Sequence, residues 1–249
     1  MSDAPFPSNG WTESAEAWIA EMGEHGDYGR QYVLDPVMLE RVRGRGFTRA
    51  LDVGCGEGRL CRMLSGLGVE TVGLDPTEPL LAQARQRHPQ GIYLTGVGGA
   101  LPFEDDRFDL VVSYLSLIDI PDFEAAISEM ARVLRPGGVL LVANLTSFST
   151  ARRQVPKTER PVGDHSIQME RYLEPRATWE QWRGIRIRNW HRPLSAYMAA
   201  FLGQGLRLTH FDEPAPIGGD PARGERYRSV PWYVVMEWEK PSPHATTTP

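Results

Sequence analysis

The chain has 249 residues, of which 41% are hydrophobic, and it carries a formal net charge of −5. This size suits one α/β domain with additions, the charge argues against a general attraction to nucleic acid, and we find neither an apolar run that would span a bilayer nor a secretory signal at the N-terminus. Only two cysteines are present, Cys55 and Cys61, so we expect no disulfide framework and a cytoplasmic location.

The first two thirds of the chain show a regular alternation of predicted elements. Residues 12–22 and 36–43 have helical patterns, and Asp35 followed by Pro36 is typical of an N-cap and a first helical residue. We then predict strands at 49–54, 70–75, 91–96, 108–116 and 139–145, with helices at 59–68, 77–88 and 121–138 between them. This alternation predicts crossover connections and a parallel sheet that is covered on both faces.

The alternation stops over residues 146–192, which are rich in arginine and tryptophan. Within them, residues 184–190 alternate like an edge or hairpin strand. A helix at 193–205 follows, and then strands at 206–214 and 226–240 joined by a Pro/Gly loop, which favours antiparallel pairing. We therefore predict an α/β, Rossmann-like three-layer sandwich with a mostly parallel seven-stranded sheet, an antiparallel C-terminal edge strand and a small lid insertion.

A glycine-rich loop follows the first predicted strand, in the stretch LDVGCGEGRL at residues 51–60. Gly54 and Gly56 allow a tight turn and close approach of a ligand to the backbone. Asp75 ends the second strand about twenty residues later, where a carboxylate is placed to accept both hydroxyls of a ribose. The pattern predicts a nucleotide site at the carboxyl ends of the strands, and it leaves open which nucleotide binds.

Two details of this loop argue against a nicotinamide dinucleotide. In the dinucleotide fingerprint G-x-G-x-x-G the third glycine allows close packing of the helix. Here Gly58 comes one position early and Arg59 occupies the required place. In addition, Asp52 lies two residues before the loop, where a carboxylate would repel a pyrophosphate but attract an ammonium or a sulfonium group.

The segment LDVGCGEG resembles the signature loop of the class I S-adenosylmethionine-dependent methyltransferases. The similarity continues through VGLDPT, LPFEDDRFDLVVSYLSL and ARVLRPGGVLLVANL, so that it covers roughly residues 50–145. The helix and hairpin predicted up to residue 240 also fit this family. The resemblance implies S-adenosylmethionine as the cofactor and S-adenosylhomocysteine as its product.

The resemblance assigns residues to the methionine part of the cofactor. Gly54 and Gly56 would line it, and Asp52 would lie beneath it. Ser113 would meet the ammonium group through its main-chain carbonyl. Arg30 precedes a helix in the N-terminal segment, from which lids of this family often provide a cation for the methionine carboxylate.

The resemblance also assigns the adenosine part. Asp75 would bind the ribose hydroxyls and Pro76 would pack on the adenine face. The family usually has an aspartate that accepts a hydrogen bond from the adenine amino group, but this sequence has Val97 there. The amide of Gly98 would still reach a ring nitrogen, so we expect binding to survive the loss of one polar contact.

Candidate acceptor residues lie outside the glycine loop. His191, directly before a predicted helix, is the candidate general base, although it would alternatively only bind a loop carbonyl. Trp190 and Arg192 flank it, and Arg192 would hold a substrate anion or else pair with a nearby acid. Tyr28 is a candidate from the N-terminal segment, and Asp119 would contact substrate or cap the next helix.

We divide the chain into an N-terminal helical lid segment (1–45), an S-adenosylmethionine-binding core (46–145), a lid and substrate insertion (146–192), the rest of the core sheet (193–240) and a disordered tail (241–249). We expect a methyltransferase that acts on a small molecule, on oxygen, without a metal, as a monomer or homodimer, and that binds no nucleic acid and no membrane. The alternatives are a catalytically silent S-adenosylmethionine- or S-adenosylhomocysteine-binding protein, an N-methyltransferase of a small metabolite, and a nucleotide-dependent oxidoreductase.

Overall fold

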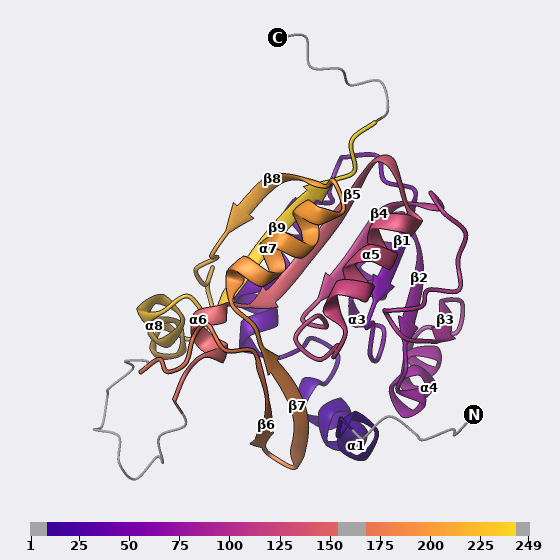
Figure 1. The fold of residues 1–249 in the computed structure, drawn as a ribbon. Coiled ribbons are helices and arrows are strands. Elements are labelled where there is room, and N and C mark those ends of the chain that lie inside the picture. Colours follow the sequence, from indigo (N-terminus) through magenta and orange to yellow (C-terminus); the bar gives the residue numbers. More distant parts are fainter. Residues whose placement is uncertain (1–8, 154–167, 243–249) are drawn as a thin grey trace, which may run out of the picture.

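The computed structural model describes residues 9–153 and 168–242 and shows a seven-stranded sheet with helices on both faces (Figure 1). The strand order is β3-β2-β1-β4-β5-β9-β8, and β6 and β7 form a separate hairpin. The strands are β1 (Arg49–Val53), β2 (Glu70–Asp75), β3 (Ile92–Thr95), β4 (Phe108–Tyr114), β5 (Leu134–Leu145), β6 (Arg176–Trp182), β7 (Ile185–His191), β8 (Arg207–Asp212) and β9 (Tyr233–Glu239). The predicted α/β architecture is confirmed.

Helices connect the parallel strands and cover the sheet. They are α1 (Trp11–Met22), the π-helix η1 (Arg30–Leu34), α2 (Asp35–Glu40), α3 (Arg59–Gly66), α4 (Glu78–Arg87), α5 (Phe123–Val133), α6 (Ser147–Thr150), α7 (Leu194–Gly203) and α8 (Pro221–Ser229). Figure 1 shows α5 and α7 side by side across the front of the sheet. In the described ranges we find no helix with both the length and the apolar character needed to cross a membrane.

The alternation of side chains along the strands builds two cores. In β5, Leu140 and Val142 pack with α5 and α7, whereas Leu141 and Ala143 pack with η1, α2 and α3 on the opposite face. Successive residues of a strand point to opposite faces, so a strand covered on both sides is apolar throughout. This is why β4 is buried along nearly its whole length.

The last strand, β9, runs antiparallel to β5, with Val139 paired to Glu239 and Leu145 to Tyr233. It is inserted between β5 and β8, so β8 is the strand at the edge of the sheet. The region before β9 was predicted as loop and strand, but residues 221–229 form α8. Asp220 caps that helix by accepting from the amide of Ala222, and Pro221 occupies its first turn.

Other boundaries also differ from the predictions. The helix predicted at 121–138 ends at Val133, because the chain turns directly into β5, where Leu134 pairs with Phe108. The insertion contains a second strand, β6, which pairs with β7 and completes the hairpin that residues 184–190 predicted. The predicted tail at 241–249 lies, from residue 243 onward, outside the described residues.

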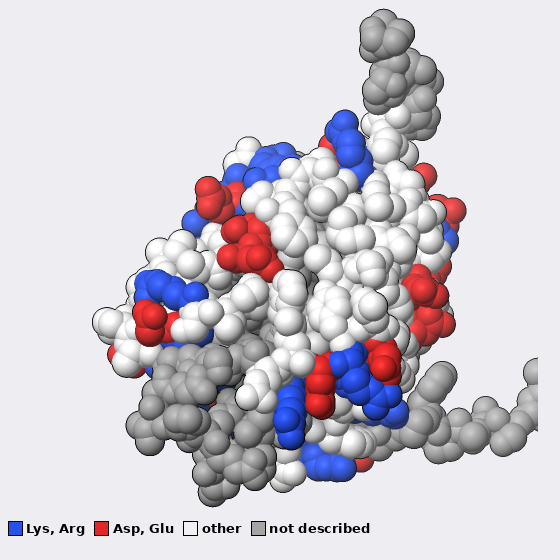
Figure 2. Space-filling view, turned by 60° about the vertical axis from the view of Figure 1, so that its left-hand side comes forward, with Lys and Arg blue, Asp and Glu red and all other residues white. Residues whose placement is uncertain are grey.

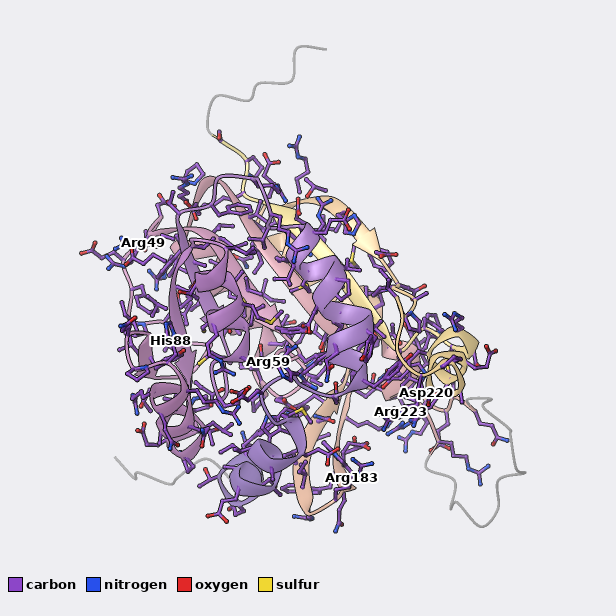
Figure 3. The ribbon with its side chains drawn as sticks, turned by 180° about the vertical axis from the view of Figure 1, so that it is seen from behind. Arg49, Arg59, His88, Arg183, Asp220 and Arg223 are labelled. Atoms are coloured by element: carbon purple, nitrogen blue, oxygen red, sulfur yellow. The ribbon has the colours of Figure 1, made fainter. Side chains whose placement is uncertain are left out.

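Asp35 was predicted to be an N-cap, but it makes no capping hydrogen bond, because η1 runs directly into α2. Its carboxylate instead forms a buried ion pair with both terminal nitrogens of Arg59 and accepts a hydrogen bond of 2.7 Å from the Tyr114 hydroxyl. Arg59 lies in the interior of the molecule, whereas Arg49 and Arg183 reach its periphery (Figure 3). The ion pair joins the N-terminal segment to the start of α3.

This ion pair predicts a specific pattern of stabilities. Arg59→Met leaves the Asp35 carboxylate buried without a cation, so we expect a loss of about 3 kcal/mol in the free energy of unfolding at neutral pH. The double variant Asp35→Asn/Arg59→Met removes both charges and keeps an acceptor for Tyr114, and it should recover most of that loss. Urea denaturation measures both values; a double variant no more stable than the single one would contradict the prediction.

Candidate active site

A cavity of about 750 Å³ opens at the carboxyl ends of the parallel strands. The glycine loop after β1 and the end of β2 form one side of it, and the segment after β4 forms another. The N-terminal segment and the β6–β7 hairpin provide the cover, and Figure 1 shows α1 beside β7 below the sheet. The site therefore combines the usual ligand position of such sheets with a cover that comes from two distant parts of the chain.

The glycine loop is packed tightly against the segment after β4. Gly54 has φ of 79°, and a Cβ atom there would lie 2.3 Å from the Cβ of Ser116. The Ser116 hydroxyl donates a hydrogen bond of 2.6 Å to the carbonyl of Val53 and lies 2.7 Å from the hydroxyl of Ser113. Only glycine combines this backbone conformation with so close an approach.

Asp75 organises the loop from the end of β2. Its Oδ2 accepts a hydrogen bond of 2.9 Å from the amide of Gly56, and its Oδ1 accepts one of 2.8 Å from the amide of Thr77. Burial raises the pKa of this carboxyl group, and the two amides act in the opposite direction. The carboxylate lines the cavity with lone pairs left for further donors, as two ribose hydroxyls would provide.

Asp52 is a buried acid with an unused oxygen. Its Oδ2 accepts from the thiol of Cys61 at 3.4 Å, whereas its Oδ1 has no hydrogen-bond partner within the described part of the chain. Burial, together with the nearby carboxylates of Asp75 and Glu57, raises the pKa of Asp52 to about 7. A cation bound in the cavity would satisfy this oxygen and stabilise its charge, so the donor set fits an ammonium or a sulfonium group.

Further predicted cofactor residues also line the cavity. Pro76, Val97 and Gly98 lie along it, and the Val97 side chain is half exposed. Arg30 lines it from η1, where its guanidinium lies 4.9 Å from the ring centroid of Trp18 and 3.1 Å from a carboxylate oxygen of Asp27.

Ser113 and Tyr28 do not line the cavity. Ser113 is fully buried within β4, which continues to Tyr114, and it is paired with Val142 of β5. The Tyr28 hydroxyl donates to the carbonyls of Gly218 and Asp220, so this ring attaches the loop before α8 to the N-terminal segment. Neither position supports the predicted contact with cofactor or substrate.

His191, Trp190 and Arg192 also lie outside the cavity wall. His191 is 1% exposed; its Nε2 donates to the carbonyl of Tyr172 and its Nδ1 lies 2.8 Å from the Thr150 hydroxyl. Burial lowers the pKa of His191, and both ring nitrogens are engaged. This placement does not support a general base, and it matches the alternative of a histidine that binds a loop carbonyl.

The hydrogen bonds of Arg192 are structural ones. Its guanidinium is buried and donates to the carbonyls of Leu117, Ile120 and Pro121 and to the hydroxyl of Tyr197. The backbone amide of Trp190 donates to the next carbonyl in the same segment, that of Ile118, at 2.7 Å. These contacts hold the segment that carries Asp119. Asp119 itself lines the cavity, and its contact with a substrate stays a prediction.

Several lining residues were not predicted. Leu115 has φ of 58°, a conformation that a leucine rarely adopts and that no sequence pattern signals. Trp11 and Trp18 line the cavity from α1, and their spacing of seven residues, which places them on one helix face, was an available signal. Trp182 lines it from β6.

No group of three or more His, Cys, Asp or Glu residues arranged for a metal ion occurs in residues 9–153 and 168–242. Cys55 and Cys61 are both free thiols. On the face shown in Figure 2, acidic and basic side chains are interspersed and separated by uncharged surface.

Comparisons with known proteins agree with this geometry. A family model described as a methyltransferase domain matches residues 51–142. The chain is 30% identical over 181 residues to a malonyl-[acyl-carrier protein] O-methyltransferase of Enterobacter lignolyticus, covering 71% of each chain. It is 40% identical over 112 residues to the protein of the same name from Salmonella typhimurium, but covers only 45% of either.

A crystal structure of an S-adenosylmethionine-dependent methyltransferase from Mesorhizobium loti has the same fold, with a TM-score of 0.70 at 24% identity. The similarity covers 87% of this chain and all of that one. The fold and the glycine loop of this chain are those of the class I S-adenosylmethionine-dependent methyltransferases. With the match to the Enterobacter relative, the chain belongs to the methyltransferase family.

The contact of Gly54 with Ser116 predicts an unequal response of the two glycines to substitution. Gly54→Ala combines a positive φ with a clash, so we expect a loss of about 2 kcal/mol or more in unfolding free energy. Gly56→Ala is the matched control, because φ is 54° there but the nearest atom to a new Cβ is Leu80 Cδ1 at 3.9 Å. We expect about 1 kcal/mol for the control, measured by urea denaturation. Equal losses would contradict the close approach.

Proposed function

We propose that this protein transfers the methyl group of S-adenosylmethionine to an oxygen atom of a small molecule bound in the cavity. The observation that carries the proposal is the juxtaposition of Asp52, with its unused buried oxygen, and Asp75, with its carboxylate held by two amides, in one cavity. The first suits the positive methionine part of the cofactor and the second suits its ribose. The names of the relatives support oxygen as the acceptor atom.

The lining residues divide between the two halves of the cofactor. Asp52, Gly54 and Gly56 would hold the methionine part, with Arg30 near its carboxylate, and Asp75, Pro76, Val97 and Gly98 would hold the adenosine part. When bound, the cofactor supplies a methyl group activated by a sulfonium. The chain has to exclude water, align the acceptor with that methyl group and accept a proton from a hydroxyl acceptor.

The rival functions are less well supported. A silent binding protein needs no space beyond its ligand, but this cavity continues past the glycine loop to Trp11, Trp18 and Trp182. A dinucleotide-dependent oxidoreductase would need room where Arg59 forms its ion pair with Asp35. An amine acceptor is the alternative that leaves the cofactor site unchanged, and product analysis separates it from an oxygen acceptor.

The charge on Asp52 predicts how cofactor binding depends on pH. S-adenosylhomocysteine carries an ammonium group, which binds the carboxylate form of Asp52. Since burial raises the pKa of Asp52 to about 7, affinity should fall as the pH is lowered through 7 towards 5.5. Asp52→Asn should bind about tenfold more weakly at pH 8 and lose most of this dependence.

Isothermal titration calorimetry measures these affinities, with NADH as the comparison ligand, which should not bind. The Asn side chain has the same shape as Asp, and a thermal melt checks that the variant is folded. Failure of the wild-type protein to bind S-adenosylhomocysteine, or binding of NADH in its place, would overturn the proposed function.

The valine at position 97 predicts that an aspartate there would increase the affinity for S-adenosylhomocysteine. Val97→Asp restores an acceptor for the adenine amino group at a half-exposed position on the cavity wall. We expect S-adenosylhomocysteine to bind about fivefold to tenfold more tightly, the value of one hydrogen bond. Val97→Ala is the control and should change the affinity less than about twofold. Unchanged or weaker binding by the aspartate variant would show that adenine lies elsewhere.

A further inference from the structure

The cavity has an aromatic chamber that the proposed cofactor residues reach only at Trp18, beside which the Arg30 guanidinium lies. Trp11, Trp18 and Trp182 line it; the first two rings lie 4.8 Å apart edge to face, and the second and third lie 6.3 Å apart. Met22 and Ile187 complete its apolar wall. At these separations the indoles pack directly against each other, edge to face, and form one joined aromatic wall whose cavity side favours a flat aromatic guest.

The walls of this chamber are fastened to each other. The Ser14 hydroxyl of α1 donates to the carbonyl of Arg186 in β7 at 3.0 Å and accepts from its amide at 2.9 Å. The amide of Arg188 donates to the carbonyl of Asn9 at 2.9 Å. The N-terminal helix and the hairpin therefore form one cover, whose aromatic residues have defined positions.

Asp119 is the acid beside this chamber. Its carboxylate accepts from the side-chain amide of Asn189 on β7, and Arg192 and the Trp190 amide hold the carbonyls on either side of it. Asp52 and Asp75 belong to the proposed cofactor site, and the remaining acids on the cavity wall have other partners. Asp27 pairs with Arg30, Glu57 pairs with Arg62 and Arg87, and Asp122 caps α5. Among the described residues, no ion pair involves Asp119.

We infer that Asp119 is the general base for methyl transfer to the hydroxyl group of an uncharged, flat aromatic acceptor held among Trp11, Trp18 and Trp182. This inference rests on the proposed function. The hydroxyl proton moves to a carboxylate oxygen of Asp119 while the acceptor oxygen forms a bond to the methyl carbon. The carbon–sulfur bond breaks, its electron pair remains on sulfur, and Asp119 later releases the proton to water.

The electrostatics around Asp119 agree with this role. Burial is the main cause that raises the pKa of Asp119 to about 8, and the charge of Asp75 acts in the same direction. Hydrogen bonds from Asn189 and Trp11 and the charge of Arg30 act in the opposite direction. A base with a pKa near the working pH accepts a proton readily and releases it again. Methyl-transfer activity should therefore rise as the pH increases through about 8. A bound sulfonium favours the carboxylate form of Asp119 and would shift this rise to lower pH.

The same carboxylate disfavours an anionic acceptor. A carboxylate substrate needs no base. In this chamber its charge would face Asp119, because Arg30 is paired to Asp27 and is assigned to the carboxylate of the cofactor. Like charges in a partly buried site repel each other strongly. The inferred acceptor is thus an uncharged hydroxyl compound and not a carboxylate. A matched pair of probes, one of each kind, separates these two acceptor classes.

The test uses 2-naphthol and 2-naphthoate with the whole chain of 249 residues. With S-adenosylhomocysteine bound, at pH 9, calorimetry should show 2-naphthol binding at least about tenfold more tightly than 2-naphthoate. Asp119→Asn should keep the affinity for 2-naphthol within about threefold and close most of the gap to 2-naphthoate. With S-adenosylmethionine, Asp119→Asn should form 2-methoxynaphthalene about 10²-fold or more slowly than the wild type, and its rate should no longer rise as the pH increases through 8.

Matched variants control both parts of the inference. Glu124→Gln removes an exposed acid of α5 that lies five residues away and outside the cavity wall, so its rate should stay within about twofold of the wild type. Trp182→Ala should weaken 2-naphthol binding about tenfold. Trp179→Ala lies on the same strand, but its ring stacks on Arg186 outside the cavity wall and should have no effect above about twofold.

The outcomes separate the two proposals. Binding of S-adenosylhomocysteine without binding of 2-naphthol, or a wild-type rate in Asp119→Asn, would overturn the inference and leave the methyltransferase function standing. Equal affinity of the wild-type protein for both probes would also overturn it. Failure to bind S-adenosylhomocysteine at all would overturn the proposed function, and the inference with it.

Discussion

The close packing of Gly54 against Ser116 is the constraint on which both halves of the cavity depend. β1 and β4 are adjacent strands, so the loops that follow them leave the sheet side by side. With no side chain at Gly54, the Ser116 hydroxyl reaches the carbonyl of Val53 and locks the two loops together. One loop then presents the amide of Gly56 to the carboxylate of Asp75, and the other carries Asp119 towards the cover. The proposed cofactor site and the proposed acceptor chamber thus share one wall.

A second constraint places the cover. The ion pair of Arg59 with Asp35 lies where a dinucleotide-binding protein has a glycine, and it joins the start of α3 to the junction of η1 and α2. Two charges removed from water are stable only when they are paired and hydrogen-bonded, as the Tyr114 hydroxyl ensures here. The π-helical turn just before Asp35 then directs Arg30 to the cavity wall. Arg59, whose place in the loop argues against a nicotinamide dinucleotide, thus also helps to position Arg30 on the cavity wall.

Residues with reactive side chains do not all serve chemistry in this fold. Arg192 uses its donors on three carbonyls of the segment after β4, which leaves that segment ordered around Asp119. His191 is held by Thr150 and by the carbonyl of Tyr172. In both cases the partners lie many residues away in the sequence. A buried guanidinium or imidazole needs all its donors satisfied, so such residues connect elements as readily as they bind ligands.

The sequence by itself determined the alternation of strands and helices, the parallel core, the antiparallel last strand and the cofactor loop, because these follow from local periodicity, turn residues and short-range spacing. It also placed Asp52, Asp75 and Asp119 at strand ends, and strand ends of a parallel sheet meet at one edge. Only the tertiary structure decided that His191, Trp190 and Arg192 lie behind the cavity wall, that residues 221–229 are helical, and that α1 and the β6–β7 hairpin close over the site. Which face of a hairpin meets a cavity depends on contacts such as Ser14 with Arg186, 172 positions apart, and no local pattern records them.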